Sequence, residues 1–200
     1  MEQILNNAVG ELAQLLPAVK AMAPELNRLG EAMLACWSAG GKVLTAGNGG
    51  SAADAMHLAE ELVARFMKTR RALAAIALCD PTVLTCTAND FGFESVFSRQ
   101  VEALGNTGDI LIVFSTSGNS ANIQRAIDTA KQRGMVTASF LGKDGGKSKG
   151  ACDFEFLVAS QLPHRIQEIH QILYHSVCEW IEERVERQGA SGKGQARSSD

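Results

Sequence analysis

The feature that most constrains this chain is a glycine-rich segment at residues 46–51 (AGNGGS), set between an apolar pair and a run of helix-forming residues. Val43 and Leu44 before it predict a buried strand, and residues 52–62 after it favour a helix. A strand, a glycine turn and a helix in this order direct backbone N–H groups and the positive end of a helix dipole toward an anion. Ser51 could cap that helix or bind a phosphate oxygen. A tight turn without a ligand is the alternative.

Short apolar runs alternate with helical patterns from residue 42 onward, which is typical of a parallel α/β sheet. The patterns predict strands at 42–46, 73–78, 109–114, 135–140 and 154–158. They predict helices between the strands at 51–67, 93–104, 119–133 and 163–187. Two amphipathic helices, at 2–17 and 24–38, come before the sheet and could cover it or pack on another subunit.

The composition fits one globular domain. The chain has 200 residues, of which 46% are hydrophobic, and this is enough for a sizeable core. We expect the domain to span 1–187, with a helical pair at 1–40 and an α/β core at 41–187. The remaining residues, 188–200, are small, polar and aperiodic, so we expect a disordered tail.

Charge and cysteine content limit the expected partners and compartment. A net charge of −3 gives no basic footprint for nucleic acid. We find no secretory leader and no apolar run of the ~18 residues that a membrane span needs, so we expect no membrane partner. The five cysteines are scattered and odd in number, which favours reduced thiols, buried at Cys79 and Cys86, in a cytoplasmic protein.

A second anion signal is the hydroxyl-rich segment 115–120 (STSGNS), which follows the apolar run 110–114. Ligands of open α/β sheets bind at the carboxyl ends of the strands, and hydroxyls with helix N-terminal amides suit a phosphate monoester. An ordinary Ser/Thr turn is the alternative. Neither loop matches a P-loop or a GxGxxG fingerprint, so the pair favours a small phosphorylated ligand over a nucleotide.

Two helical segments carry residues that could hold a metal. His57 and Glu61 lie four positions apart, so they share a helix face and could bind one ion or form a simple surface pair. Gln167 and His175 lie eight positions apart and also share a face, with His170 near enough to support them. A capped polar face and a core or interface histidine are the alternative interpretations.

The last candidate is the segment at 89–93 (NDFGF). Asn89 and Asp90 precede the helix that we predict at 93–104, so they could reach the hydroxyls of a sugar. A plain N-cap role for Asp90 is equally compatible with the sequence.

Taken together, these motifs resemble the bacterial phosphoheptose isomerases of the sugar-isomerase (SIS) domain superfamily. The resemblance runs from about Gly41 to Glu186 and rests on GNGGSAADAMHLAEEL, ANDFGF, FSTSGNSAN, GKDGG and RIQEIHQILYH. It implies an SIS-type three-layer sandwich with a five-stranded parallel sheet flanked by helices. It also implies conversion of D-sedoheptulose 7-phosphate to D-glycero-D-manno-heptose 7-phosphate, an early step toward heptose nucleotides for lipopolysaccharide.

The resemblance further implies a set of site residues and a homotetramer with active sites at subunit interfaces. One zinc ion per subunit would be held by His57, Glu61, Gln167 and His175. The residues that would bind substrate are Asn48, Gly49, Gly50, Ser51, Glu61, Asn89, Asp90, Ser115, Thr116, Ser117, Ser120 and Gln167. Ala52 departs from the family pattern, since some relatives carry a histidine there.

The chemistry suits these side chains. Moving a carbonyl between C2 and C1 needs a base and an acid, and we expect Glu61 to take the proton and His175 to supply one through an enediol. Zinc would polarise the carbonyl. The alternative is a non-catalytic SIS protein that binds the replication initiator or senses a sugar phosphate. Retention of the four metal-binding residues together favours the enzyme. The substrate could also be another phosphorylated ketose.

Overall fold

The computed structural model describes residues 1–195, and within them one five-stranded parallel sheet forms the centre of the molecule. The strand order is β2-β1-β3-β4-β5, so the chain starts near the middle and winds outward both ways. The strands are β1 (Val43–Gly47), β2 (Ala75–Ala77), β3 (Ile110–Ser115), β4 (Val136–Gly142) and β5 (Phe154–Val158). Every neighbouring pair is parallel. The predicted fold class is confirmed.

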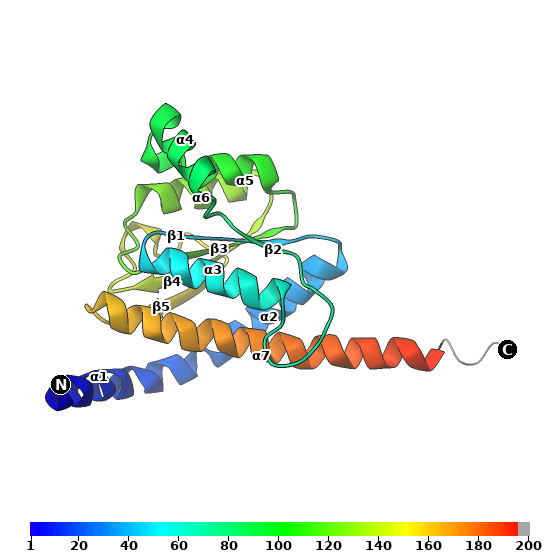
Figure 1. The fold of residues 1–200 in the computed structure, drawn as a ribbon, viewed down its shortest axis with the longest axis horizontal. Coiled ribbons are helices and arrows are strands. Elements are labelled where there is room, and N and C mark those ends of the chain that lie inside the picture. The colour runs from blue at the N-terminus through cyan, green and yellow to red at the C-terminus, as the bar shows by residue number, and fades with distance from the viewer. Residues whose placement is uncertain (196–200) are drawn as a thin grey trace.

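Helices cover both faces of the sheet (Figure 1). One face carries α2 (Ala23–Ser38), α3 (Gly50–Val63) and α7 (Pro163–Gln195), and the other carries α5 (Ser98–Leu104) and α6 (Ala121–Gln132). The central strand β3 explains why two layers form. Ile110, Ile112 and Phe114 belong to one buried cluster, whereas Leu111 and Val113 belong to the other. Its apolar run is continuous because both of its faces are buried.

The core under α7 is built from stacked aromatic rings. Phe114 on β3 lies 4.8 Å from Phe140 on β4, and Phe140 lies 4.8 Å from Phe156 on β5, measured between ring centroids. Ile166 and Leu173 of α7 belong to the same cluster. This aromatic row fixes α7 across the sheet.

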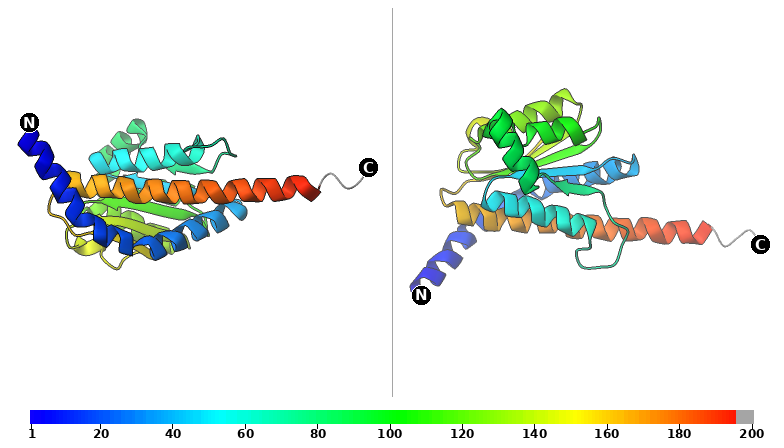
Figure 2. Two further views of the ribbon diagram at one scale, coloured as in Figure 1. Left: turned by 90° about the horizontal axis from the view of Figure 1, so that it is seen from below. Right: turned by 45° about the horizontal axis from the view of Figure 1, so that its top comes forward.

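Helix α7 extends well beyond the body of the domain (Figures 1 and 2). It continues through Gln195, so the predicted helix end at 187 is wrong, whereas the disordered tail at 188–200 stays a prediction. Glycine and serine weaken a helix, but this segment lacks a proline, which would remove a backbone donor and break the hydrogen-bond ladder. The last part of the predicted tail, 196–200, lies outside the described residues.

The N-terminal helix α1 (Glu2–Ala21) projects from the body at an angle to α7 (Figure 2). It runs through Pro17, where the sequence predicted its end, and none of its residues is buried. It contacts α7 and α2 mainly through its second half. Along residues 1–195, no helix combines the length and the apolar character needed to cross a bilayer.

The segment 81–104 differs most from the prediction. An unpredicted helix, α4 (Pro81–Phe91), begins at Asp80, whose side chain accepts hydrogen bonds from the N–H groups of Thr82 and Val83. The helix predicted at 93–104 is divided into a 3₁₀ turn, η1 (Phe93–Ser95), and α5. The helix predicted at 51–67 ends at Val63. A second 3₁₀ turn, η2 (Gly146–Ser148), precedes β5. Cys86 on α4 is exposed and Cys79 is half-buried, so both thiols differ from the prediction of burial.

Candidate functional site

Three predicted metal-binding side chains converge between α3 and α7. His57 and Glu61 project from one face of α3, and His175 projects from α7, which packs beside it (Figure 1). Their ligand atoms all lie within 4.8 Å of one another. His57 Nε2 lies 3.2 Å from Glu61 Oε1, and the rings of His57 and His175 are 5.0 Å apart. Residues more than a hundred positions apart in the sequence therefore form one cluster.

The cluster has the properties of a metal site. His175 Nε2 is buried, and no described residue gives it a hydrogen bond. A buried nitrogen without a partner costs about 1–3 kcal/mol, and a bound cation would satisfy it. Burial, and then the neighbouring His57, lower the pKa of His175, which favours the neutral imidazole that binds metals. Two imidazoles and a carboxylate are donors typical of zinc and similar divalent ions.

The second nitrogen of His57 faces a tyrosine. Tyr174 Oη lies 2.9 Å from His57 Nδ1, and the amide nitrogen of Gln171 lies 3.4 Å from the same atom. Tyr174 is buried beside His175, with ring centroids 4.7 Å apart. The motif interpretation did not include Tyr174 or Gln171. The sequence did contain a signal for them. Gln171 lies four positions from both Gln167 and His175 on the same helix, and Tyr174 directly precedes His175.

Asp54 is a buried carboxylate one turn before His57 on α3. Its Oδ2 is buried and has no hydrogen-bond partner among the described residues. Burial raises the pKa of Asp54 to about 6, and the nearby His57 partly counteracts this. The sequence analysis did not single out Asp54, because helix periodicity alone does not reveal an uncompensated charge.

His170 is not part of the cluster. Its ring is buried against Phe114 and Phe140, and Nε2 lies 3.1 Å from the carbonyl oxygen of Leu141. It is therefore a core histidine, which is the alternative interpretation from the sequence.

Gln167 contacts the glycine loop. A Cβ atom at Gly50 would lie only 2.4 Å from Gln167 Nε2, so the amide lies directly over the start of α3. A larger residue at Gly50 would displace this amide. Gln167 therefore connects α7 to the glycine loop, on the same helix face as His175.

The glycine loop itself lies at the carboxyl end of β1. Gly49 is the N-cap residue with φ of +57°, a conformation that favours glycine, and α3 begins at Gly50. Ser51 is already in the first turn and is not the N-cap, so of its two possible roles the capping one is wrong. Asn48 exchanges two hydrogen bonds, of 2.8 and 2.9 Å, with Asn122 on α6. This pair joins the loop after β1 to the helix after β3.

The hydroxyl-rich loop lies at the same edge, because β1 and β3 are parallel neighbours. Ser115 Oγ accepts from the N–H of Gly118, and Ser117 Oγ accepts from the N–H of Asn119. Thr116 and Ser120 are partly exposed, and Ser120 precedes α6 without a side-chain capping bond. The structure thus brings the two predicted anion loops together, with some hydroxyls used in local turns.

Asn89 and Asp90 lie apart from these groups. They occupy the last turn of α4, on the side of the sheet opposite α3 and α7 (Figure 1). Both are exposed, and Asn89 Nδ2 donates to Asp90 Oδ1 at 2.7 Å. Because Asp90 is near the end of a helix, the N-cap alternative is wrong. Within one chain the structure does not bring these two residues to the metal cluster.

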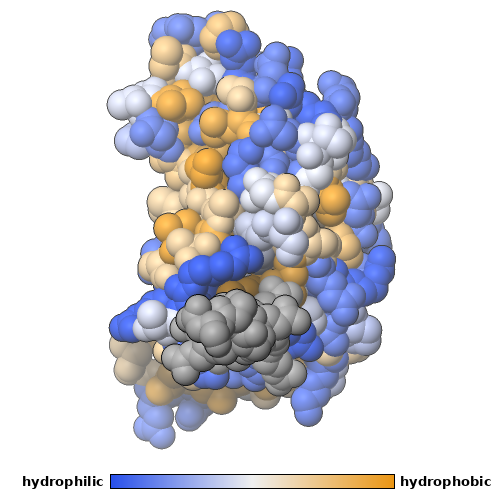
Figure 3. Space-filling model, turned by 90° about the vertical axis from the view of Figure 1, so that its right-hand side faces the viewer, coloured by the Kyte–Doolittle hydropathy of each residue, from blue (hydrophilic) through white to orange (hydrophobic). Residues whose placement is uncertain are grey.

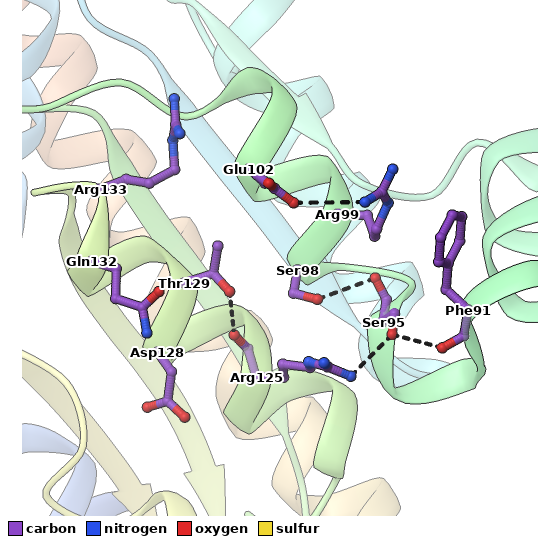
Figure 4. Close-up of a pocket in the computed structure, with 10 residues that line it drawn as sticks. All are labelled: Phe91, Ser95, Ser98, Arg99, Glu102, Arg125, Asp128, Thr129, Gln132 and Arg133. Carbon is purple, nitrogen blue, oxygen red and sulfur yellow. Dashed lines mark hydrogen bonds and ion pairs between the residues drawn. The ribbon is translucent and has the colours of Figure 1, made fainter.

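Two cavities lie beside α6. One of about 310 Å³ is lined by Asn48, Ser120 and Asn122 together with residues of η1 and α6. The other, of about 820 Å³, lies between α5 and α6 (Figure 4). Much of its polar lining is paired internally: Arg125 donates to Ser95, and Arg99 faces Glu102. Of the predicted substrate-binding residues, Asn48 and Ser120 line the smaller cavity, and none lines the larger one.

Known proteins are similar to this chain in both sequence and fold. The SIS domain family model matches residues 9–142. Phosphoheptose isomerase of Fusobacterium nucleatum is 49% identical over 158 residues, covering 79% of this chain and 81% of that protein. Phosphoheptose isomerase of Paramagnetospirillum magneticum is 47% identical over 180 residues, covering 89% and 94%. The solved phosphoheptose isomerase from Francisella tularensis superimposes with a TM-score of 0.86 at 35% identity, covering 90% of this chain and 97% of that one. The chain belongs to the SIS domain family and, within it, to the phosphoheptose isomerases.

Proposed function

We propose that this protein converts D-sedoheptulose 7-phosphate to D-glycero-D-manno-heptose 7-phosphate through an enediol. The observation that carries the proposal is the convergence of His57, Glu61 and His175, which supply a base, an acid and metal ligands within 4.8 Å. The relatives are named phosphoheptose isomerases, which supports a phosphorylated heptose as the substrate class.

Glu61 and His175 would carry the two proton transfers. One carboxylate oxygen of Glu61 faces His57 at 3.2 Å, which leaves the other oxygen to take the proton from C1. His175 would deliver a proton at C2. When zinc is bound by His57, Glu61, Gln167 and His175, it supplies Lewis-acid polarisation of the substrate carbonyl.

The two loops at the carboxyl edge of the sheet would hold the substrate. Helices α3 and α6 begin there, and their N-terminal amides favour the phosphate group. The proposed substrate-binding residues of the loops are Asn48, Gly49, Gly50, Ser51, Ser115, Thr116, Ser117 and Ser120. Glu61 and Gln167 would contact the sugar from the helices.

We further propose a homotetramer in which active sites form between subunits. Asn89 and Asp90 are exposed and distant in the fold from the metal cluster of their own chain, so a second subunit is the way they would contact substrate. Apolar residues are exposed on α1, including Leu5 at 61% and Val9 at 60%. The side of the molecule from which the end of α7 projects, on the right in Figure 1, also shows apolar patches among hydrophilic residues (Figure 3). The five free cysteines suit the reducing cytoplasm.

The test is to incubate the pure protein with sedoheptulose 7-phosphate, with and without zinc, and to follow aldose formation by NMR. We expect zinc-dependent conversion. Glu61→Gln and His175→Gln should each lower turnover by at least about 10²-fold, because each removes a proton-transfer group.

Glu60→Gln is the matched control, since Glu60 is the exposed neighbour of Glu61 on α3 and should retain turnover. Near-wild-type rates in Glu61→Gln or His175→Gln would contradict the assigned roles. A protein that neither binds zinc nor converts any ketose phosphate would instead support the non-catalytic alternative.

A further inference from the structure

We propose that Tyr174 is a positioning residue for the metal centre: its hydroxyl holds Nδ1 of His57, so that Nε2 is the nitrogen presented to the metal. The inference rests on the proposed function, because it assumes that His57 is a metal ligand. It assigns a role to a residue outside the predicted ligand and substrate sets.

The two nitrogens of His57 have separate partners. Nδ1 lies 2.9 Å from the hydroxyl oxygen of Tyr174, while Nε2 lies 3.2 Å from Oε1 of Glu61. The rings of His57 and Tyr174 meet edge to face, with centroids 5.5 Å apart. Gln171 lies further from Nδ1, at 3.4 Å, so the tyrosine is the stronger partner. The imidazole is therefore held from one side, and its other nitrogen faces the carboxylate.

Burial makes this contact rigid. Tyr174 is only 1% exposed, and its ring packs against Phe114 as well as His175. These ring contacts are ones that a phenylalanine ring could also make. The hydroxyl is thus not required for packing, and a buried tyrosine hydroxyl normally needs a hydrogen-bond partner. Its partners here are the imidazole of His57 and the side chain of Gln171. Because Tyr174 precedes His175 directly, one turn of α7 supplies a ligand and also orients the other histidine.

A tyrosine hydroxyl suits both states of the site, because it can donate and accept. Without metal, the hydroxyl donates to Nδ1, and Nε2–H donates to Glu61. With metal on Nε2, Nδ1 carries the proton and donates to the hydroxyl oxygen. Metal-binding histidines usually donate their second N–H in this way, and loss of such a partner typically weakens metal affinity about 10- to 100-fold.

Tyr174→Phe tests the inference, because it removes only the hydroxyl from a ring that stays buried. Zinc affinity is measured by competition with a chelator, and the cobalt-substituted protein gives an absorption spectrum of the site. We expect zinc binding to weaken about 10- to 100-fold and the cobalt spectrum to change. In the zinc-bound wild type, NMR should show a slowly exchanging His57 Nδ1–H that is lost in the variant.

Thr45→Val is the matched control. Thr45 on β1 is also fully buried. Its hydroxyl donates to the carbonyl oxygen of Ala55 at 2.7 Å. Ala55 lies on α3, the helix that carries His57, but Thr45 has no hydrogen bond to His57. It should reduce the free energy of unfolding by an amount similar to that of Tyr174→Phe, while zinc affinity and the cobalt spectrum stay at wild-type values. This comparison separates a positioning role from a purely structural one.

The outcomes distinguish the inference from the proposed function. Wild-type zinc affinity in Tyr174→Phe, beside an active wild-type enzyme, overturns the inference alone. Zinc binding that depends on Tyr174 in a protein without isomerase activity supports the inference and refutes the proposed function. If Tyr174→Phe does not fold, the wild-type NMR spectrum decides, because a proton on Nε2 of His57 in the zinc-bound protein overturns the inference.

Discussion

The buried ring of His170 shows how much a single residue can set the acid sensitivity of this fold. Its Nε2–H donates to the carbonyl oxygen of Leu141, and Nδ1 is buried without a partner among the described residues. Burial lowers the pKa of His170 from 6.5 to about 4, so the folded protein keeps the ring neutral. Stability from this residue is therefore complete above pH 6.5 and is lost as the pH falls toward 4.

We predict that His170 accounts for roughly 3 kcal/mol of the free energy of unfolding lost by the metal-free protein between pH 7 and pH 4, since each pKa unit is worth about 1.4 kcal/mol. His170→Gln cannot titrate and should lose correspondingly less over this range. Urea unfolding at several pH values measures the difference. His164→Gln, at an exposed position on the same helix, should behave like the wild type. Parallel pH curves for wild type and His170→Gln would refute the prediction.

At the scale of elements, a buried ion pair fixes the loop between α3 and β2. Glu182 on α7 accepts hydrogen bonds from the N–H groups of Phe66, Met67 and Lys68, and lies 3.7 Å from the guanidinium of Arg70. Arg70 in turn donates to the carbonyl oxygens of Glu61 and Leu62, at the end of α3. The loop, α3 and α7 are thus joined beside the metal cluster, where the ring of Phe66 contacts that of His175.

Glu182→Gln should destabilise the fold by about 3–5 kcal/mol, because it leaves the charge of Arg70 buried and uncompensated. Hydrogen exchange of the amides of residues 66–68 should accelerate, since their acceptor loses its charge. The control is Glu102→Gln, which removes a surface ion pair with Arg99 whose side chains are half exposed and which should change stability by less than about 1 kcal/mol. Equal stability losses in the two variants would show that the buried pair has no special role.

The elements also show what the sequence could predict. The apolar runs predicted all five strands. The signal is continuous in β1, β3 and β4, which are buried on both faces, whereas the edge strand β2 has no buried residue and was predicted from its short apolar run alone. Helix α4 was missed because its threonines and Val83 favour strands, although Asp80 and Pro81 were a readable helix start. In the site, the motifs predicted residues that the fold brings together, His57, Glu61 and His175, but they did not single out Tyr174 or Asp54. Asp54 is distinguished by its burial, and Tyr174 by its burial and by a contact with His57, 117 positions away; local patterns report neither.

At the scale of the whole molecule, we predict that the exposed face of α1 packs between subunits. Leu5 and Val9 lie one turn apart, and no described residue buries them. If α1 packs between subunits, the double variant Leu5→Glu and Val9→Glu should convert the proposed tetramer into smaller species and reduce activity. Light scattering after size-exclusion chromatography measures the mass. The thermal unfolding of the isolated subunit should not change, because both positions are exposed within one chain.

Gln3→Glu with Asn7→Glu is the matched control for this experiment. These two residues are exposed, lie at the same spacing on α1 and bond to each other at 2.8 Å. The control adds the same charge to a polar part of the helix and should keep the wild-type mass. A tetramer that survives in the Leu5 and Val9 variant would exclude α1 from the subunit interface.

The position of α7 after all five strands also determines when the core is closed during synthesis. Every strand leaves the ribosome before α7 does, yet α7 covers the aromatic row of Phe114, Phe140 and Phe156 and carries His175. A growing chain therefore exposes an apolar face of the sheet until α7 emerges. During that interval chaperones could bind the exposed face. Closure of the core and completion of the metal cluster then occur together, so a translation product that ends before His175 has neither.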